Sequence, residues 1–226
     1  MAGNKRPWLL GHRGVPYREN TARGLDECLA AGLDGAEIDV QLLADGTVVV
    51  FHDLDLRRLA NDPRAIASLR AGELASVRVF GEPIPTLAEI LDRWPSDRWL
   101  NVELKAGGRA LVDATLEQLE RRERIVISSF DPTMLEAARA RGCEHELALL
   151  LEARSPAWLH VDGGRSFGCR SVHLDATLVS PATIERYAKL GLGVGFWGAR
   201  SLEIERRLAQ LGVVRVITDH IVRAPA

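Results

Sequence analysis

Two acidic side chains stand two residues apart in the apolar stretch GAEIDV, which covers residues 35–40. On a β-strand, residues two apart point to the same face, so Glu37 and Asp39 would share one face. The stretch WLNVELK repeats this spacing with Glu103 and Lys105. If the three carboxylates converge, they repel one another unless a cation lies among them. Oxygen ligands suit Mg²⁺, Ca²⁺ or Mn²⁺ better than zinc, so we predict one such ion held by Glu37, Asp39 and Glu103.

Other reactive side chains also follow short apolar runs. His12 and Arg13 come after PWLL, His52 and Asp53 come after TVVVF, and Trp197 ends GVGFW. Each has an ordinary structural explanation. Alternating acids commonly face solvent, a single histidine after a strand is more often structural than catalytic, and a large aromatic side chain can fill a core as well as wall a pocket. Their interpretation as one site therefore depends on a fold that brings these strand ends together.

Eight strand-like segments alternate with helical or loop segments along the chain, which predicts a (β/α)8 TIM barrel. An open doubly wound sheet is the main alternative, but no glycine-rich dinucleotide loop follows any of the strands. In a barrel, functional side chains lie at the C-terminal ends of the strands. His173 and Asp175 share a face of the sixth strand and would either reach substrate or pack. The predicted strands cover residues 7–11, 35–40, 99–104, 124–129, 147–151, 171–175, 193–197 and 214–218.

The second predicted strand continues into a hairpin. Asp45-Gly46 is a turn signal between GAEIDVQLL and TVVVF. Residues 54–84 are then irregular and charged, with prolines and glycines spread along them. About 30 such residues cannot bury much of a core, so we expect a small excursion with short helices after the second barrel strand. The prediction is a single domain spanning residues 1–226.

Composition narrows the classes of partner. The formal charge of −2 gives no electrostatic argument for binding nucleic acid or an anionic membrane surface. The three cysteines, Cys28, Cys143 and Cys169, are widely spaced and include no CxxC pair, which argues against a disulfide framework or zinc site. The opening residues lack the apolar core of a signal peptide, and no apolar run approaches the length of a membrane span. We therefore expect a cytoplasmic protein without membrane insertion; its oligomeric state is left open.

The order and spacing of the motifs resemble those of the glycerophosphodiester phosphodiesterase family. The resemblance is carried by GHRG, ENT, EIDVQLLADGTVVVFHD, IPTLAEIL and VELK. It runs from residue 9 to about residue 131, where SSFD also looks like a family motif, and extends weakly to ITD near residue 219. Some positions depart from the family pattern, among them WGAR at 197–200 in place of WTVN. That departure concerns the alcohol-binding side of the barrel mouth.

The resemblance implies a role for each motif residue. It implies a barrel in which Glu37, Asp39 and Glu103 bind one divalent cation, Mg²⁺ or Ca²⁺, with Mn²⁺ also suitable. It implies further that His12 and His52 act as the acid–base pair. A histidine side chain suits this chemistry because its ordinary pKa of about 6.5 lets it give or take a proton near neutral pH. Which ring acts as the acid is left open.

The implied reaction is the hydrolysis of a small-molecule glycerophosphodiester to glycerol 3-phosphate and an alcohol. By the same resemblance, Arg13 and Lys105 hold the phosphate. Trp197, from its place at the end of a strand, would either wall the substrate pocket or fill the core. The attacking oxygen could come from water or from the vicinal hydroxyl of the substrate. Two alternatives remain: a phospholipase D-like enzyme acting on lysophospholipids or sphingomyelin, and a barrel that binds a phosphate ligand without turnover.

Overall fold

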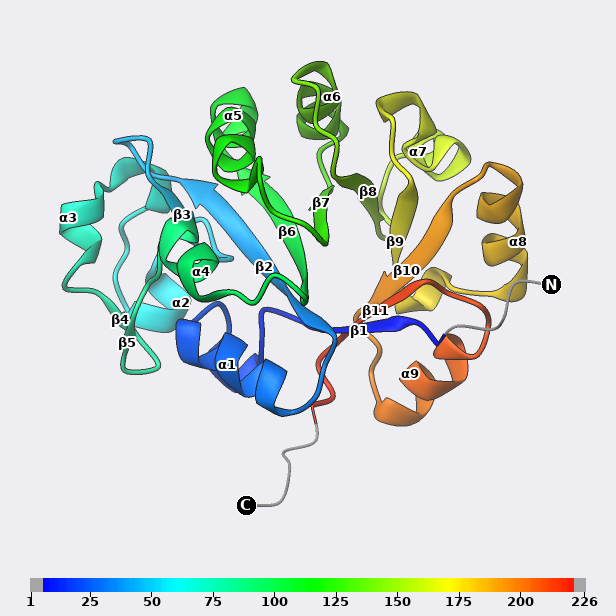
Figure 1. Ribbon diagram of the computed structural model, residues 1–226, viewed down its shortest axis with the longest axis horizontal. Helices are drawn as coiled ribbons and strands as arrows, with labels where there is room; N and C mark the ends of the chain where they lie inside the picture. Colours follow the sequence, from blue (N-terminus) through cyan, green and yellow to red (C-terminus); the bar gives the residue numbers. More distant parts are fainter. Residues whose placement is uncertain (1–5, 222–226) are drawn as a thin grey trace.

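The computed structural model describes residues 6–221 and contains a closed ring of eight parallel strands (Figure 1). The ring closes because β1 pairs with both β2 and β11. Every predicted barrel strand is present to within two residues at each end, and the predicted (β/α)8 barrel is confirmed. The strands are β1 (Trp8–Gly11), β2 (Gly35–Leu42), β6 (Trp99–Ala106), β7 (Ile125–Ser129), β8 (Glu146–Leu151), β9 (Ser171–Asp175), β10 (Gly193–Trp197) and β11 (Arg215–Thr218).

Helices surround the ring on its outside (Figure 1). Several begin at side-chain caps: Thr21 accepts the N–H of Gly24, and Thr86 forms a reciprocal capping box with Glu89. The helices that follow barrel strands or lead into them are α1 (Ala22–Ala30), α4 (Leu87–Arg93), α5 (Gly108–Leu119), α6 (Pro132–Ala140), α7 (Ala157–Asp162), α8 (Pro181–Lys189) and α9 (Leu202–Ala209). Short 3-10 turns lie at Pro16–Arg18, Ile66–Ser68, Arg165–Phe167 and Ala176–Leu178. None of the helices within residues 6–221 combines the length and apolarity needed to cross a membrane.

Strand parity separates the apolar core from the barrel interior. Ile38 and Val40 on β2 and Val102 on β6 are fully buried in the main apolar cluster, together with residues of the surrounding helices. Their neighbours of the other parity, Glu37 and Asp39, are equally buried but face the inside of the ring. The apolar layer under the helices therefore supports a polar interior.

The excursion after β2 is anchored at both of its ends. β3 (Val48–Val50) pairs antiparallel with β2, and its other edge meets the returning chain. Val49 bridges to Thr86, and the N–H of Val50 donates to the carbonyl of Pro85 over 2.9 Å. Between these points lie α2 (Arg57–Ala60), α3 (Ala71–Leu74), β4 (Arg78–Val79) and β5 (Glu82–Pro83).

The excursion buries more apolar surface than we expected. Leu56, Ile66 and Leu69 are at most 1% exposed, and they form a second apolar cluster with Phe51 and other residues of the hairpin. The short helices agree with the prediction. The number of domains stays a prediction.

Candidate active site

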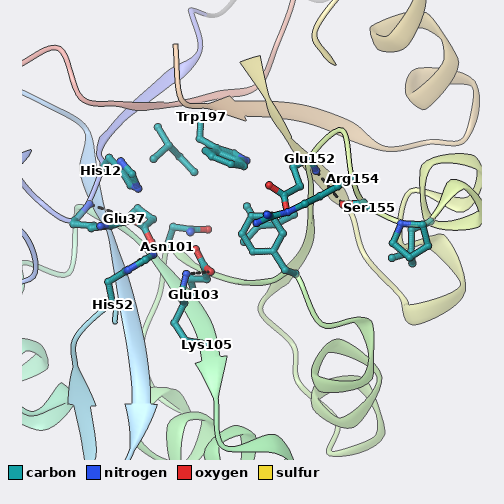
Figure 2. Close-up of a pocket in the computed structure, with 16 residues that line it drawn as sticks. His12, Glu37, His52, Asn101, Glu103, Lys105, Glu152, Arg154, Ser155 and Trp197 are labelled. Atoms are coloured by element: carbon teal, nitrogen blue, oxygen red, sulfur yellow. Dashed lines mark hydrogen bonds and ion pairs between the residues drawn. The ribbon is translucent and has the colours of Figure 1, made fainter. Parts of the chain in front are cut away.

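A pocket of about 660 Å³ opens at the C-terminal ends of the barrel strands (Figure 2). It is lined from two sides. One side carries the residues singled out after β1, in β2 and β6 and after β3, and the other carries residues that follow β7 and β8 and the last residue of β10. Asp39 lies next to the pocket, in contact with lining residues. The predicted site residues that line the pocket are His12, Arg13, Glu37, His52, Glu103, Lys105 and Trp197.

The three predicted metal ligands lie together. Glu37, Asp39 and Glu103 each offer a carboxylate oxygen, and these oxygens lie within 4.8 Å of one another. The residues are only 2%, 1% and 8% exposed. Glu37 Oε1 and Asp39 Oδ1 are buried without a hydrogen-bond partner. Asp39 Oδ1 forms an ion pair with Lys105, and Glu37 Oε1 has no partner. Buried, convergent carboxylates of this kind fit a hard divalent cation, so the residues present are suited to one.

The pKa values of the three carboxyl groups reflect the mutual repulsion of buried acids placed close together. Burial and the charge of Asp39 raise the pKa of Glu37 to about 8, and the same two causes raise the pKa of Glu103 to about 7. Burial would also raise the pKa of Asp39, but the charges of Lys105 and Arg13 lower it below its ordinary value. Asp39 is therefore the carboxylate that the protein itself compensates most fully.

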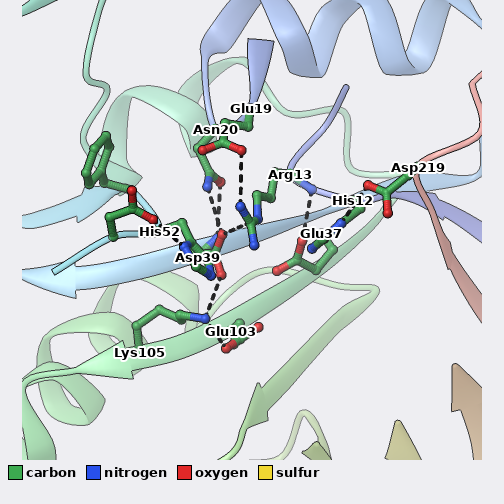
Figure 3. Close-up of polar contacts among 12 residues, drawn as sticks. His12, Arg13, Glu19, Asn20, Glu37, Asp39, His52, Glu103, Lys105 and Asp219 are labelled. Carbon is green, nitrogen blue, oxygen red and sulfur yellow. Dashed lines mark hydrogen bonds and ion pairs between the residues drawn. The ribbon is translucent and has the colours of Figure 1, made fainter. Parts of the chain in front are cut away.

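Asp39 is held by residues from three parts of the chain (Figure 3). Asn20 donates from its side-chain amide to Asp39 Oδ2 over 2.8 Å, and its side-chain oxygen accepts the N–H of Asp39 over 3.2 Å. Arg13 Nε lies 3.2 Å from Asp39 Oδ2. Lys105 Nζ lies 3.4 Å from Asp39 Oδ1 and donates to Glu103 Oε1 over 2.8 Å. These contacts fix the carboxylate from both sides.

Arg13 reaches the cluster through an unusual backbone conformation. Its φ of 53° lies in the left-handed region, which is unfavourable for a side chain of this kind. In this conformation its N–H donates to Glu37 Oε2 over 2.9 Å, while its guanidinium donates to Glu19 over 3.1 Å. The strained residue thus contacts three acids of the site, Glu37 through its backbone and Glu19 and Asp39 through its side chain.

His12 and His52 each have a carboxylate partner. His12 Nδ1 lies 2.8 Å from Asp219 Oδ1, and His52 Nδ1 lies 2.7 Å from Asp53 Oδ1. A carboxylate at Nδ1 favours the tautomer with the proton on that atom, which leaves Nε2 to exchange a proton with a ligand. In both close-up views Glu37 lies between the two rings (Figures 2 and 3).

The two histidines differ in their electrostatic surroundings. Burial alone would lower the pKa of His12, but its hydrogen bond to Asp219 and the charge of Glu37 raise it. Burial lowers the pKa of His52, and the attraction of Asp39 and Asp53 does not outweigh it. Neighbouring acids thus favour the protonated form of the first ring more than that of the second.

Sequence reasoning assigned no role to the partners of these side chains. Asp219 belongs to the weak ITD match, and Asn20 belongs to ENT. Asp53 adjoins His52, and it is held in turn by Arg58, whose Nε donates to Asp53 Oδ2 over 2.6 Å. Arg58 also binds Glu19. Asp219, Asn20 and Asp53 each lie within a family-like motif, and this is the signal that could have found them.

The far side of the pocket is aromatic. The rings of Phe130 and Trp197 meet edge to face with centroids 5.7 Å apart, and Lys105 Nζ lies 5.9 Å from the centre of the Phe130 ring. Glu152, one residue beyond β8, also lines this side. Phe130 belongs to the SSFD motif, whereas nothing in the sequence pointed to Glu152. His173 does not line the pocket; it is fully buried inside the barrel.

Residues 12–223 match the model of the glycerophosphoryl diester phosphodiesterase family. A glycerophosphodiester phosphodiesterase of Caldanaerobacter subterraneus is 29% identical over 231 residues, which cover 93% of each chain. The structure of a glycerophosphodiester phosphodiesterase from Thermotoga maritima matches 96% of each chain at 28% identity, with a TM-score of 0.83. A phosphodiesterase of Oleispira antarctica, solved in complex with the product sn-glycerol-3-phosphate, matches 96% of this chain and 94% of its own at 24% identity, with a TM-score of 0.86.

Proposed function

Because this chain belongs to the glycerophosphoryl diester phosphodiesterase family, we propose that it hydrolyses glycerophosphodiesters to glycerol 3-phosphate and an alcohol, using one divalent cation and two histidines. One observation carries the proposal. The carboxylates of Glu37, Asp39 and Glu103 converge at the barrel mouth, and the ring of His12 and the ring of His52 lie on either side of Glu37. The cation is Mg²⁺, Ca²⁺ or Mn²⁺, the ions that accept all-oxygen ligation.

The proposed chemistry divides between the cation and the side chains. A bound cation would withdraw negative charge from a nonbridging oxygen of the phosphodiester. Arg13 and Lys105 line the same pocket and carry positive charge beside the carboxylates. We assign the remaining phosphate oxygens to them, because a guanidinium donates two parallel hydrogen bonds and an ammonium offers a compact charge. Trp197 and Phe130 wall the opposite side, where the alcohol would lie.

The histidines carry the proton transfers. One ring takes a proton at Nε2 from the attacking oxygen, and the other delivers a proton from Nε2 to the departing alcohol. Asp219 and Asp53 keep the Nδ1 atoms of His12 and His52 occupied, so both rings present Nε2. Such transfers contribute on the order of 10² to 10⁴ in rate.

Turnover of a substrate panel tests the proposal. The panel contains glycerophosphodiesters with several alcohols, a lysophospholipid and sphingomyelin, each assayed with EDTA and after addition of Mg²⁺, Ca²⁺ or Mn²⁺. We expect alcohol release from the glycerophosphodiesters, loss of activity in EDTA and recovery with added metal. Full activity in EDTA, with metal analysis showing an empty protein, would refute the metal requirement. Release from the lipids alone would favour the phospholipase D-like alternative, and no release from any substrate would favour a binding barrel.

We also propose that the chain forms one domain and works in the cytoplasm. The excursion returns to the β2–β3 hairpin, which supports a single unit. Cys28, Cys143 and Cys169 are free thiols, which suits a reducing compartment. A single cooperative unfolding transition and fractionation of cells with an antibody against the chain test these two statements. Two separate transitions, or recovery from the secreted fraction, would contradict them.

A further inference from the structure

His173 is fully buried inside the barrel, does not line the pocket and has no part in the proposed chemistry. In an eight-stranded barrel of this kind the strands are staggered by one residue from each to the next, so inward side chains from alternate strands form layers of four. The strand registers place Glu37, Ser128, His173 and Ile217 in one layer. β2 and β9 are four strands apart in the ring, so Glu37 and His173 face each other across the barrel.

The tautomer of the His173 ring follows from its contact with Arg215. Arg215 Nη1 lies 3.0 Å from His173 Nε2, and a guanidinium can only donate. Nε2 is therefore the acceptor, and the neutral ring carries its proton on Nδ1. Burial and the charge of Arg215 lower the pKa of His173 to about 3, in keeping with a neutral ring. Glu146 holds the guanidinium through contacts of 3.1 and 3.2 Å.

A glycine on the neighbouring strand leaves space for the His173 ring. A β-carbon on Gly195 would lie 2.7 Å from His173 Cδ2, so the glycine makes room for the imidazole. Asn101 belongs to the layer below, where its neighbours on alternate strands include Gly195 and Ala148. The amide of Asn101 donates to Ser128 Oγ over 2.9 Å, which leaves its Oδ1 free.

Three buried polar atoms in these two layers have no protein partner: His173 Nδ1, Asn101 Oδ1 and Glu37 Oε1. With Glu37 ionised, as it would be when it binds a cation, one of these atoms is a donor and two are acceptors. Each unsatisfied buried group costs about 1–3 kcal/mol, so native interiors pair such groups directly or through water. A single water molecule matches this set, since it accepts one hydrogen bond and donates two.

We propose that one internal water molecule accepts from His173 Nδ1 and donates to Asn101 Oδ1 and Glu37 Oε1, which makes His173 a positioning residue for the Glu37 carboxylate. An oxygen of a carboxylate has two lone pairs, so Oε1 can accept this bond and still coordinate a cation. Arg13 N–H holds the second oxygen of Glu37, and the water orients the first. The effect on the cation rests on the metal site of the proposed function; the water site does not.

A crystal structure of the wild-type protein in EDTA tests the water site directly. We expect density for one water molecule within hydrogen-bonding distance of His173 Nδ1, Asn101 Oδ1 and Glu37 Oε1. A well-ordered interior without that density overturns the inference, whether or not the protein binds metal. This measurement needs no variant, so it stands even if a substitution in the barrel prevents folding.

A matched pair of variants tests the positioning role. His173→Leu keeps about the volume of histidine and His173→Asn makes the side chain smaller; both remove the ring nitrogen that contacts Arg215, but only asparagine retains a donor near the position of Nδ1. We expect His173→Leu to weaken metal binding about tenfold or more by calorimetry, while His173→Asn stays close to wild type. Equal affinities for the two folded variants would overturn the role of His173. A wild-type protein that binds no cation would instead contradict the proposed function.

Discussion

Replacing Glu37 with glutamine should stabilise the metal-free protein, and the gain should grow as the pH rises. Burial and the charge of Asp39 raise the pKa of Glu37 from an ordinary 4.5 to about 8. Each pH unit of difference corresponds to about 1.4 kcal/mol, so ionising Glu37 in the folded protein costs on the order of 5 kcal/mol. Glutamine has nearly the same shape and carries no charge, and its side-chain oxygen can still accept the N–H of Arg13.

The pH window follows from the two ionisation states. Between about pH 4.5 and pH 8 the unfolded chain has lost the Glu37 proton while the folded chain keeps it. The unfolded state therefore binds fewer protons, and the stability of the wild type falls as the pH rises through this window. Above the window the cost is constant. The difference between variant and wild type should be near zero at the low end and largest at the high end.

Urea denaturation in EDTA at a series of pH values measures this difference. Glu146→Gln is a control of opposite sign. Burial would raise the pKa of Glu146, but the charge and hydrogen bonds of Arg215 lower it, so this carboxylate contributes stability above its unfolded pKa that is lost as the pH falls. Its replacement should destabilise the protein at neutral and alkaline pH. A Glu37→Gln effect that is the same at both ends of the series, or that becomes destabilising at high pH, would refute the reasoning.

The remaining predictions concern the histidines and the barrel interior. Of His12→Ala and His52→Ala, the variant that lacks the general acid should lose about 10² to 10⁴ in rate on a glycerophosphodiester with an alkyl alcohol and far less on a nitrophenyl ester, whereas loss of the base should slow both. Four rate constants at saturating metal, for two variants on two substrates, test this. Near wild-type rates in both variants on the alkyl substrate would refute the acid–base pair. Equal large losses on both substrates would refute the assignment of one ring as acid and the other as base. Asp219→Asn should lower the pKa of His12, measured by NMR titration in EDTA, because the carboxylate raises it; an unchanged or higher value contradicts this. Gly195→Ala should lower the free energy of unfolding by about 1–3 kcal/mol, measured by denaturation, because the new methyl group overlaps the imidazole of His173. Gly72→Ala, at a helical position with open space around it, should be neutral or stabilising. Equal effects of the two substitutions would argue against the overlap.

Strand parity made the barrel and the carboxylate cluster predictable. The two-residue period of a strand determines which side chains share a face, so Glu37 and Asp39 can be placed together from the amino-acid order alone. The pairing of His12 with Asp219 could not be predicted in this way. The two residues are 207 positions apart, and only closure of β11 onto β1 brings them together.

Features outside the regular elements were the least predictable. Glu152 lines the pocket from the loop after β8, where no periodic pattern constrains the backbone. The apolar cluster of the excursion, which includes Leu56 and Ile66, comes from short irregular turns, so its burial depends on tertiary contacts that composition does not reveal. His173 was open to two interpretations because parity points it inward but does not say how deep it lies.

Because β3 is paired along both of its edges, the position of His52, which follows β3, does not depend on the length of the excursion. β2 holds one edge of β3, and the chain returning at Pro85 and Thr86 holds the other, so the excursion begins and ends on a fixed base. Each doubling of the length of a flexible loop costs only about 0.6 kcal/mol. Over evolutionary time, insertions and deletions between these anchors can remodel the rim of the barrel while the histidine keeps its position. Changes in its length should therefore leave the pocket intact, because no residue of the excursion is among those that line it.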